Sequence, residues 1–232
     1  MIEVYPAESR YTSDLGWLQS HLSFSFGEYY DAKNANFSVM RVCNDDFLVP
    51  NRGFGAHPHS DMEIVSVVLS GSIRHEDNLG HVAISSFGEV QRMSAGTGVI
   101  HTEHNPSSTE ELNLLQMWFE PHTRGLEPSY QTSRFDPDQL QGRLLPIVSQ
   151  QGAENVASIQ QDLTIYLSKL AAGEQIAFDQ SSSRKTYLFV IDGACSVNGK
   201  TLLPRDAARV EQESGLSIVA DQDVFFMLID LP

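Results

Sequence analysis

Residues 67–72 read Val-Val-Leu-Ser-Gly-Ser, and residues 189–194 read Phe-Val-Ile-Asp-Gly-Ala. Each stretch is a short apolar run that is typical of a buried strand, closed by a polar residue and a glycine that indicate a turn. Two further pairs match in the same order, residues 90–93 with 207–210 and residues 98–100 with 215–217. The repeated pattern predicts that one β unit occurs twice in the chain.

The sequence around these stretches favours strands almost everywhere. Short apolar runs closed by Gly, Asn, Asp or Pro recur along the chain, and helical periodicity is scarce. Asn198-Gly199 is a strong signal for a two-residue hairpin. Many short strands separated by turns predict an all-β sandwich or barrel with few short helices. We expect strands near residues 37–42, 64–69, 72–76, 112–119, 158–167, 187–192, 216–220 and 224–231.

The length of 232 residues fits one large β domain or two of about 100 residues, and the repeat favours two. Residues 121–137 carry Pro, Gly, Ser and Arg with little apolar periodicity, which is typical of a surface linker. We therefore predict a first domain over residues 1–122, a linker over 123–137 and a second domain over 138–232.

Composition limits the class of partner and the compartment. The chain has 30 acidic and 15 basic side chains and a net charge of −15, without a visible basic patch, so we expect no direct binding to nucleic acid. The start has no secretory signal pattern and the longest apolar run is too short to span a bilayer, so we expect a soluble cytoplasmic protein. Cys43 and Cys195 have no CxxC spacing and are interpreted as buried free thiols.

All eight histidines lie within the first 122 residues. Side chains alternate across a strand, so His57 and His59 share one face, as do His101 and Glu103. Two such strands meeting inside a barrel bring together three imidazoles and one carboxylate, which is a metal-binding set. These ligands suit iron, copper, nickel, manganese or zinc, and the absence of thiolates argues against a structural zinc site.

The sequence offers one further candidate ligand, Glu63, and weaker candidates among the other histidines. Glu63 competes with Glu103, because it follows His59 by four residues with the same parity. His104 has the opposite parity and is expected to point away from the site. The remaining histidines have no partner at ligand spacing and are interpreted as ordinary residues: His21, His75, His81 and His122.

The second half lacks these ligands. The repeat places Ile218 and Ala220 at the positions of His101 and Glu103, and it places Asp179 and Ser181 at those of His57 and His59. We therefore expect the second copy to act as a packing partner or to form a pocket without a metal.

The histidine motifs resemble those of the cupin superfamily. His57-x-His59-x-x-x-Glu63 fits the first cupin motif, although Gly53 is two residues nearer the first histidine than usual and the spacing from Glu63 to Gly71 is one residue longer. Gly98, His101 and Asn105 fit the end of the second motif.

Within that superfamily the chain resembles the pirins over essentially its full length. The resemblance rests on these motifs in order: Gly16-Trp17-Leu18, Phe24-Ser25-Phe26, Tyr29-Tyr30-Asp31, Arg41-Val42, Asn44-Asp45-Asp46, His57-Pro58-His59, Ser94-Ala95-Gly96-Thr97-Gly98, His101-x-Glu103 and Asp230-Leu231-Pro232. It implies a bicupin with two jelly-roll β-barrels packed together and one metal in the N-terminal barrel. It also implies His57, His59, His101 and Glu103 as ligands, and so favours Glu103 over Glu63, for which we hypothesise a role in supporting a ligand histidine.

The resemblance also implies an activity. Some pirins resemble quercetinases, which open the flavonol ring with O2 and release carbon monoxide. We therefore expect a metal-dependent dioxygenase acting on quercetin or a related flavonol, with iron(II) as the metal and Glu103 as both ligand and proton acceptor. The alternative is a non-catalytic regulatory protein that senses a metal or redox state and binds a protein partner, as other pirins do.

Overall fold

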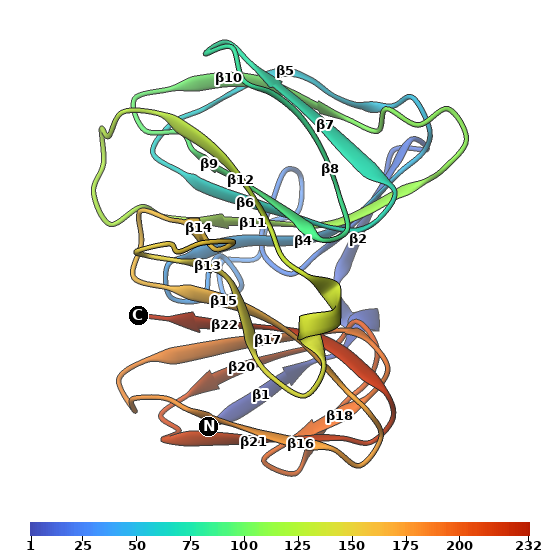
Figure 1. Ribbon diagram of the computed structural model, residues 1–232, viewed down its shortest axis with the longest axis vertical. Coiled ribbons are helices and arrows are strands. Elements are labelled where there is room, and N and C mark those ends of the chain that lie inside the picture. The colour runs from blue at the N-terminus through green and yellow to red at the C-terminus, as the bar shows by residue number, and fades with distance from the viewer. The chain divides into compact units, whose positions relative to one another are not determined.

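The computed structural model describes residues 1–232 and is almost entirely β-structure, so the predicted all-β class is confirmed. The only helices are two short 3-10 turns, Ala7–Ser9 and Pro137–Leu140. No helix has the length and apolar character needed to cross a membrane. The chain forms two compact units (Figure 1). Each unit has one large sheet of six or seven strands and one sheet of four strands.

The first barrel consists of residues 11–135 and 151–161. Apolar residues from both of its sheets pack together, such as Ile73 with Val68 and Leu112. Its seven-stranded sheet has the order β12 (Ser129–Arg134), β9 (Glu89–Ser94), β6 (Glu63–Ser70), β11 (Leu112–Phe119), β4 (Met40–Leu48), β3 (Leu18–Leu22) and β2 (Tyr11–Asp14). Its four-stranded sheet has the order β5 (Gly53–His59), β10 (Val99–His104), β7 (Ser72–Asp77) and β8 (Val82–Ser86). This unit also contains the short strand β14 (Ala157–Ser158).

The second barrel consists of residues 1–10, 136–150 and 162–232. One sheet has the order β1 (Ile2–Tyr5), β20 (Ala207–Glu211), β17 (Lys185–Asp192), β22 (Val224–Leu231), β15 (Thr164–Leu170) and β13 (Leu145–Ser149). The other has the order β16 (Gln175–Asp179), β21 (Gly215–Ala220), β18 (Cys195–Val197) and β19 (Lys200–Leu202). The strand order therefore repeats that of the first barrel, as the sequence pattern predicts.

The two repeated stretches end at glycines that the fold requires. Gly71 lies between β6 and β7 with φ +74°, and Gly193 lies between β17 and β18 with φ +75°. A Cβ at either position would collide with backbone, at Glu111 and Asp223 respectively. Glycine is the one residue that adopts this left-handed conformation without strain and allows so close an approach.

The units divide the chain differently from the predicted domain boundaries. Strand β1 pairs with β20 and belongs to the second barrel, although residues 1–122 were expected to form the first. The predicted linker over residues 123–137 contains strand β12, which pairs with β9. β1 and β12 are the outermost strands at equivalent edges of their sheets. Each pairs with the backbone N–H and C=O groups of the strand beside it, which would otherwise lack partners. Residues 151–161 also return to the first barrel.

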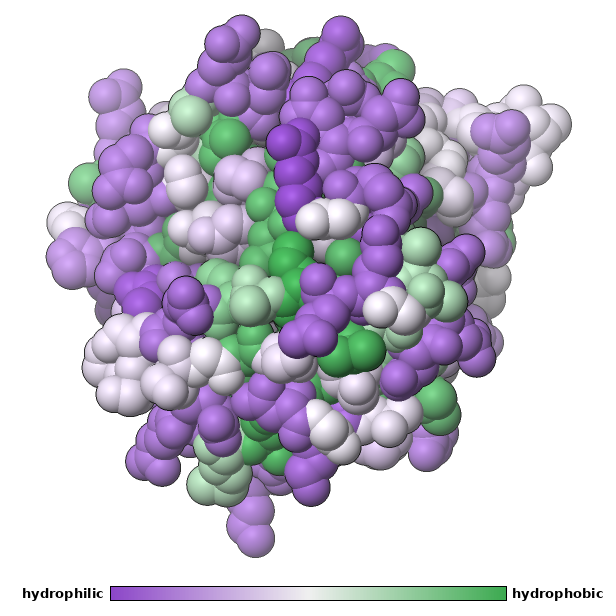
Figure 2. All heavy atoms as spheres, turned by 60° about the horizontal axis from the view of Figure 1, so that its bottom comes forward, coloured by the Kyte–Doolittle hydropathy of each residue, from purple (hydrophilic) through white to green (hydrophobic).

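The hairpin at Asn198-Gly199 is confirmed, since it joins β18 to β19 with positive φ at both residues. Cys43 and Cys195 are buried and free, as expected. The face seen in Figure 2 is largely hydrophilic, with hydrophobic residues gathered near its centre and scattered elsewhere, in keeping with the net charge of −15.

The pairing register of the strands identifies the residues of the second barrel that correspond to His57 and His59. His59 pairs with Val99 in the first barrel, and Phe178 pairs with Leu216, the counterpart of Val99, in the second. His57 and His59 therefore correspond to Ile176 and Phe178, and the assignment to Asp179 and Ser181 was wrong. A constant spacing fails here because the segment from β5 to β6 differs in length from that between β16 and β17.

Candidate metal centre

Three histidines from neighbouring strands converge inside the first barrel. β5 and β10 are antiparallel neighbours, and His57 lies directly opposite His101. The ligand nitrogens of His57, His59 and His101 lie within 4.8 Å of one another. The shared faces that strand alternation predicts for the His57/His59 and His101/Glu103 pairs are therefore present, whereas His104 is half-buried on the other side of β10.

A β-bulge orients His57. The register between β5 and β10 shifts between His101 and Glu103, so that β5 gains one residue over its partner. The His57 Nδ1 atom lies 2.7 Å from the Gly55 carbonyl oxygen, which only accepts hydrogen bonds. His57 therefore carries its proton on Nδ1, and its Nε2 lone pair faces the His101 Nε2 atom at 2.9 Å.

His59 and His101 are held in their neutral form. Burial, followed by the neighbouring His57, lowers the pKa of His59 to about 4. Burial, with further contributions from His57 and His59, lowers the pKa of His101 to about 3. Neutral imidazoles are the form that binds metal ions.

The nitrogen geometry fits one metal ion. Two imidazole nitrogens that bind an ion at about 2.1 Å and at right angles to each other lie about 3 Å apart. The His57 and His101 Nε2 atoms are separated by 2.9 Å, and the donor set contains no thiolate. The residues present therefore suit an ion bound by nitrogen and oxygen ligands.

Glu103 lies at the inner end of this site. Its side chain is buried and groups with His75 and His101 as a second set of potential ligands. Burial raises the pKa of Glu103, and a hydrogen bond from Gln116 Nε2 to Oε2, at 2.8 Å, opposes that rise. The carboxylate is therefore held in place by an amide on the adjacent sheet.

His75 belongs to the site, although the sequence interpretation treated it as ordinary. It lies on β7 opposite Glu103, and its ring nitrogen Nδ1 is 3.2 Å from His101 Nδ1. Its other neighbour is Asp77, on the same face of the strand. The missed signal is the pattern His75-x-Asp77, which has the same parity as the ligand pairs.

Glu63 lies elsewhere. Its Oε2 atom accepts hydrogen bonds from Ser94 Oγ, at 2.7 Å, and from the Gln160 backbone N–H, at 3.1 Å. Neither partner is a histidine, so the hypothesis that Glu63 supports a ligand histidine was wrong. Burial raises its pKa, and these bonds oppose the rise.

A cavity of about 390 Å³ opens beside the histidines and is lined by His57 and Glu103. One part of its wall is polar, with Ser20, Asn44, Asp46 and Gln116. The Asn44 Oδ1 atom is buried there without a hydrogen-bond partner. The rest is mainly aromatic and aliphatic and includes Tyr11, Phe26, Tyr29, Phe54 and Trp118.

Comparisons with known proteins agree with this arrangement. Residues 5–119 match the family model described as Pirin, and residues 146–231 match the quercetinase C-terminal cupin domain. The chain is 39% identical to a protein of Escherichia coli K12 named quercetin 2,3-dioxygenase, over 100% of this chain and 99% of the relative. The chain belongs to the pirin family.

Other pirin relatives extend the comparison. A pirin-like protein of Caulobacter vibrioides is 37% identical, with 99% of both chains covered. The crystal structure of the bacterial pirin YhhW from Escherichia coli in complex with nickel(II) superposes with a TM-score of 0.95, at 38% identity, over 100% of this chain and 99% of that one. The predicted family and two-barrel cupin fold are therefore confirmed.

Proposed function

We propose that this pirin is a metal-dependent dioxygenase that opens quercetin or a related flavonol with O2. The proposed ligands are His57, His59, His101 and Glu103, and iron(II) is the proposed metal. The observation that carries the proposal is the pair of Nε2 atoms facing each other at 2.9 Å beside a cavity of about 390 Å³. The name of the Escherichia coli relative and the nickel(II) complex of YhhW support it.

A divalent ion bound here would supply Lewis acidity, which favours the deprotonated form of an enolic hydroxyl. The chain supplies the acceptor for that proton. Glu103 keeps Oε2 on the Gln116 amide, so the carboxylate is fixed while Oε1 is not engaged by a hydrogen bond. Acceptance of the substrate hydroxyl proton by Glu103 is the step that general-base catalysis requires.

The cavity wall suits a flat aromatic molecule with hydroxyl groups. Aromatic side chains bury large apolar rings and favour stacked or edge contacts. The polar part of the wall, with Ser20, Asn44 and Asp46, offers hydrogen-bond partners to hydroxyl groups of the bound molecule. A flavonol combines both properties, whereas an aliphatic acid lacks the ring.

The direct test loads the apoprotein with iron(II) under anaerobic conditions and then adds quercetin and O2. We expect oxygen uptake and stoichiometric release of carbon monoxide. His101→Ala should lower both rates by at least about 100-fold, because removal of a ligand exceeds the roughly 10- to 100-fold effect of an outer-shell change. His104→Ala is the matched control and should retain the wild-type rates.

Two outcomes would contradict the proposal. Equal rates in wild type and His101→Ala would place the chemistry elsewhere. Stable metal binding without oxygen uptake would favour the alternative, a metal- or redox-sensing protein that regulates a partner.

A further inference from the structure

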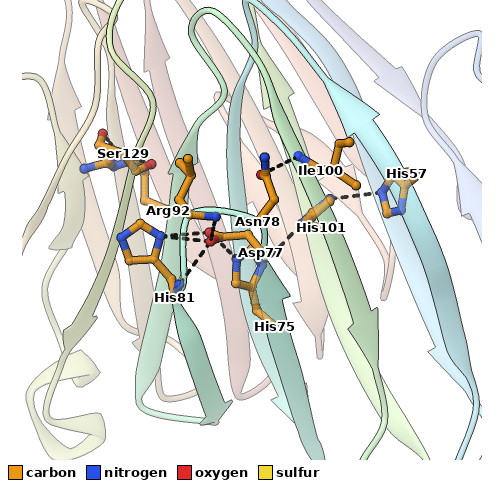
Figure 3. Close-up of polar contacts among 10 residues, drawn as sticks. His57, His75, Asp77, Asn78, His81, Arg92, Ile100, His101 and Ser129 are labelled. Atoms are coloured by element: carbon orange, nitrogen blue, oxygen red, sulfur yellow. Dashed lines mark hydrogen bonds and ion pairs between the residues drawn. The ribbon is translucent and has the colours of Figure 1, made fainter.

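A chain of hydrogen-bonding groups runs from His101 through His75 and Asp77 to His81 (Figure 3). His101 Nδ1 lies 3.2 Å from His75 Nδ1, and His75 Nε2 lies 3.1 Å from Asp77 Oδ2. Asp77 also contacts His81 Nδ1, at 2.9 Å. His75 and Asp77 are almost completely buried, whereas the side chain of His81 is 39% exposed and ends the chain near solvent.

The hydrogen bonds to Asp77 favour its ionised form. Its Oδ1 atom accepts the backbone N–H groups of Leu79, at 2.9 Å, and of His81, at 3.0 Å. Burial opposes ionisation of Asp77, but the hydrogen bonds from His75, His81 and the backbone outweigh it and lower the pKa of the carboxyl group. Asn78 ties the same turn to β10, since its Oδ1 accepts from the Ile100 N–H.

The ionised Asp77 carboxylate determines which ring nitrogens of His75 and His101 carry a proton. It only accepts hydrogen bonds, so His75 must carry its proton on Nε2. The Nδ1 atom of His75 is then an acceptor, and the opposing His101 Nδ1 must carry the proton. The lone pair of His101 is therefore on Nε2, directed at His57 Nε2.

His57 has the same tautomer as His101, with its proton on Nδ1 and its lone pair on Nε2, because its Nδ1–H donates to the Gly55 carbonyl oxygen. Two Nε2 lone pairs then face each other at 2.9 Å, an arrangement that a cation between or beside them relieves. The ring of Tyr130 stacks on His75, with centroids 4.2 Å apart and planes 15° apart, and keeps the His75 ring from turning.

We propose that Asp77 and His75 are positioning residues that fix the tautomer of His101, so that its Nε2 atom is available to a metal ion. The inference rests on the proposed metal site. The second barrel shows that the fold does not need the pair. By register, Cys195 and Val197 occupy the positions of His75 and Asp77 there, and Ile218 occupies that of His101.

The decisive variant is Asp77→Asn. The amide oxygen must stay with the backbone N–H groups of Leu79 and His81, so the NH2 group faces His75 Nε2 and donates to it. His75 then carries its proton on Nδ1 and donates to His101 Nδ1, which moves the His101 proton to Nε2. The variant keeps the shape of the site but presents the wrong tautomer to the ion.

Two measurements detect the change of tautomer that Asp77→Asn is expected to cause. The first is a competition titration of apoprotein with nickel(II) against a chromophoric chelator, in which we expect Asp77→Asn to bind about 10- to 100-fold more weakly than wild type. The second is a long-range ¹H–¹⁵N spectrum of histidine-labelled apoprotein, which reports which ring nitrogen is protonated. We expect His75 to be protonated on Nε2 in wild type and on Nδ1 in the variant.

The matched control is Glu76→Gln, the neighbouring carboxylate on β7, which pairs with Arg74 and is partly exposed. It should bind nickel(II) within about twofold of wild type, because a surface ion pair contributes little. An equal loss in both variants would show a general charge effect and overturn the proposal.

The wild-type spectrum alone is sufficient to overturn the inference, even if Asp77→Asn does not fold. A His75 protonated on Nδ1 in wild type would do so. Binding of two nickel(II) ions per chain would instead make His75 a ligand with Glu103 and also contradict a positioning role. If wild type binds no nickel(II), iron(II) or zinc(II), the proposed function fails, and the wild-type tautomers still decide the hydrogen-bond chain.

Discussion

The two barrels share one strand order but differ in what fills them. The second barrel contains a large apolar cluster, with fully buried residues such as Leu188, Ile218 and Phe226. Two apolar clusters of the first barrel are smaller, and the histidines and the cavity occupy part of its interior. One scaffold therefore accepts either a continuous apolar core or a polar site at equivalent positions.

The equivalent positions make this difference specific. His57, His59, His101 and Glu103 correspond to Ile176, Phe178, Ile218 and Ala220. Burying polar groups costs free energy unless each finds a partner, whereas apolar groups contribute directly to stability. The hydrogen bonds of Gly55, Gln116 and Asp77 are the partners that make the polar set tolerable in the first barrel.

The largest expected effect comes from giving the first barrel the residues of the second. The double variant His57→Ile/His101→Ile removes both facing Nε2 atoms. We expect nickel(II) binding to fall below about a tenth of an ion per chain, since only His59 and Glu103 of the four proposed ligands remain. Metal analysis after loading and desalting measures this change.

The same double variant should still fold. His57 and His101 contact each other, and replacing both partners of such a contact by apolar groups is often close to neutral. His75 Nδ1 loses its contact with His101, however, so we expect the free energy of unfolding of the apoprotein to fall by about 1–3 kcal/mol. His104→Ile is the matched control on the other face of β10 and should bind a full equivalent. A double variant that binds nickel(II) normally would contradict the assignment of the site.

The second prediction concerns the apolar core of the second barrel. Phe226→Ala removes a fully buried ring and should lower the free energy of unfolding by about 3–5 kcal/mol, as measured by urea denaturation. Phe225→Ala, next in sequence and only half-buried, should cost much less. Equal losses would show that the apolar cluster is not the main source of stability in that barrel.

The sequence predicted the features that depend on local periodicity. Strand alternation was sufficient to place His101 and Glu103 on one face, and the repeated glycine turns identified the second barrel. Strand pairing between distant segments could not be predicted in this way. The pairing of β1 with β20 and of β12 with β9 joins residues far apart in the chain, and a run as short as residues 2–5 does not indicate its partner.

The same limit applies to the site. His75 and Asp77 lie on β7, which pairs on one side with β8, the next strand in sequence, and on the other side with the more distant β10. Their contact with His101 on β10 therefore depends on the order of the strands. The bulge at Gly55 likewise depends on register. The ligand set follows from short-range spacing, whereas the groups that orient it follow from topology.

The smallest expected effect comes from Asp46 in the polar cavity wall. Burial raises its pKa to about 7, with Asp45 and Glu103 adding to the rise and a hydrogen bond from Ser20 opposing it. The folded apoprotein therefore holds a proton that the unfolded chain loses above about pH 4. This contribution to stability is complete below that pH and is lost as the pH rises through about 7.

Urea denaturation of the apoprotein at pH 5 and pH 8 tests this sign. Wild type should lose at least about 1.4 kcal/mol more stability over that interval than Asp46→Asn, which corresponds to one pKa unit. Glu110→Gln, an exposed carboxylate of the same barrel, should behave as wild type does. A wild type that gains stability relative to Asp46→Asn as the pH rises would show that Asp46 is ionised in the folded state. Because Ser168 corresponds to Asp46 by register, the second barrel has no equivalent proton, and this dependence on pH belongs to the barrel with the cavity.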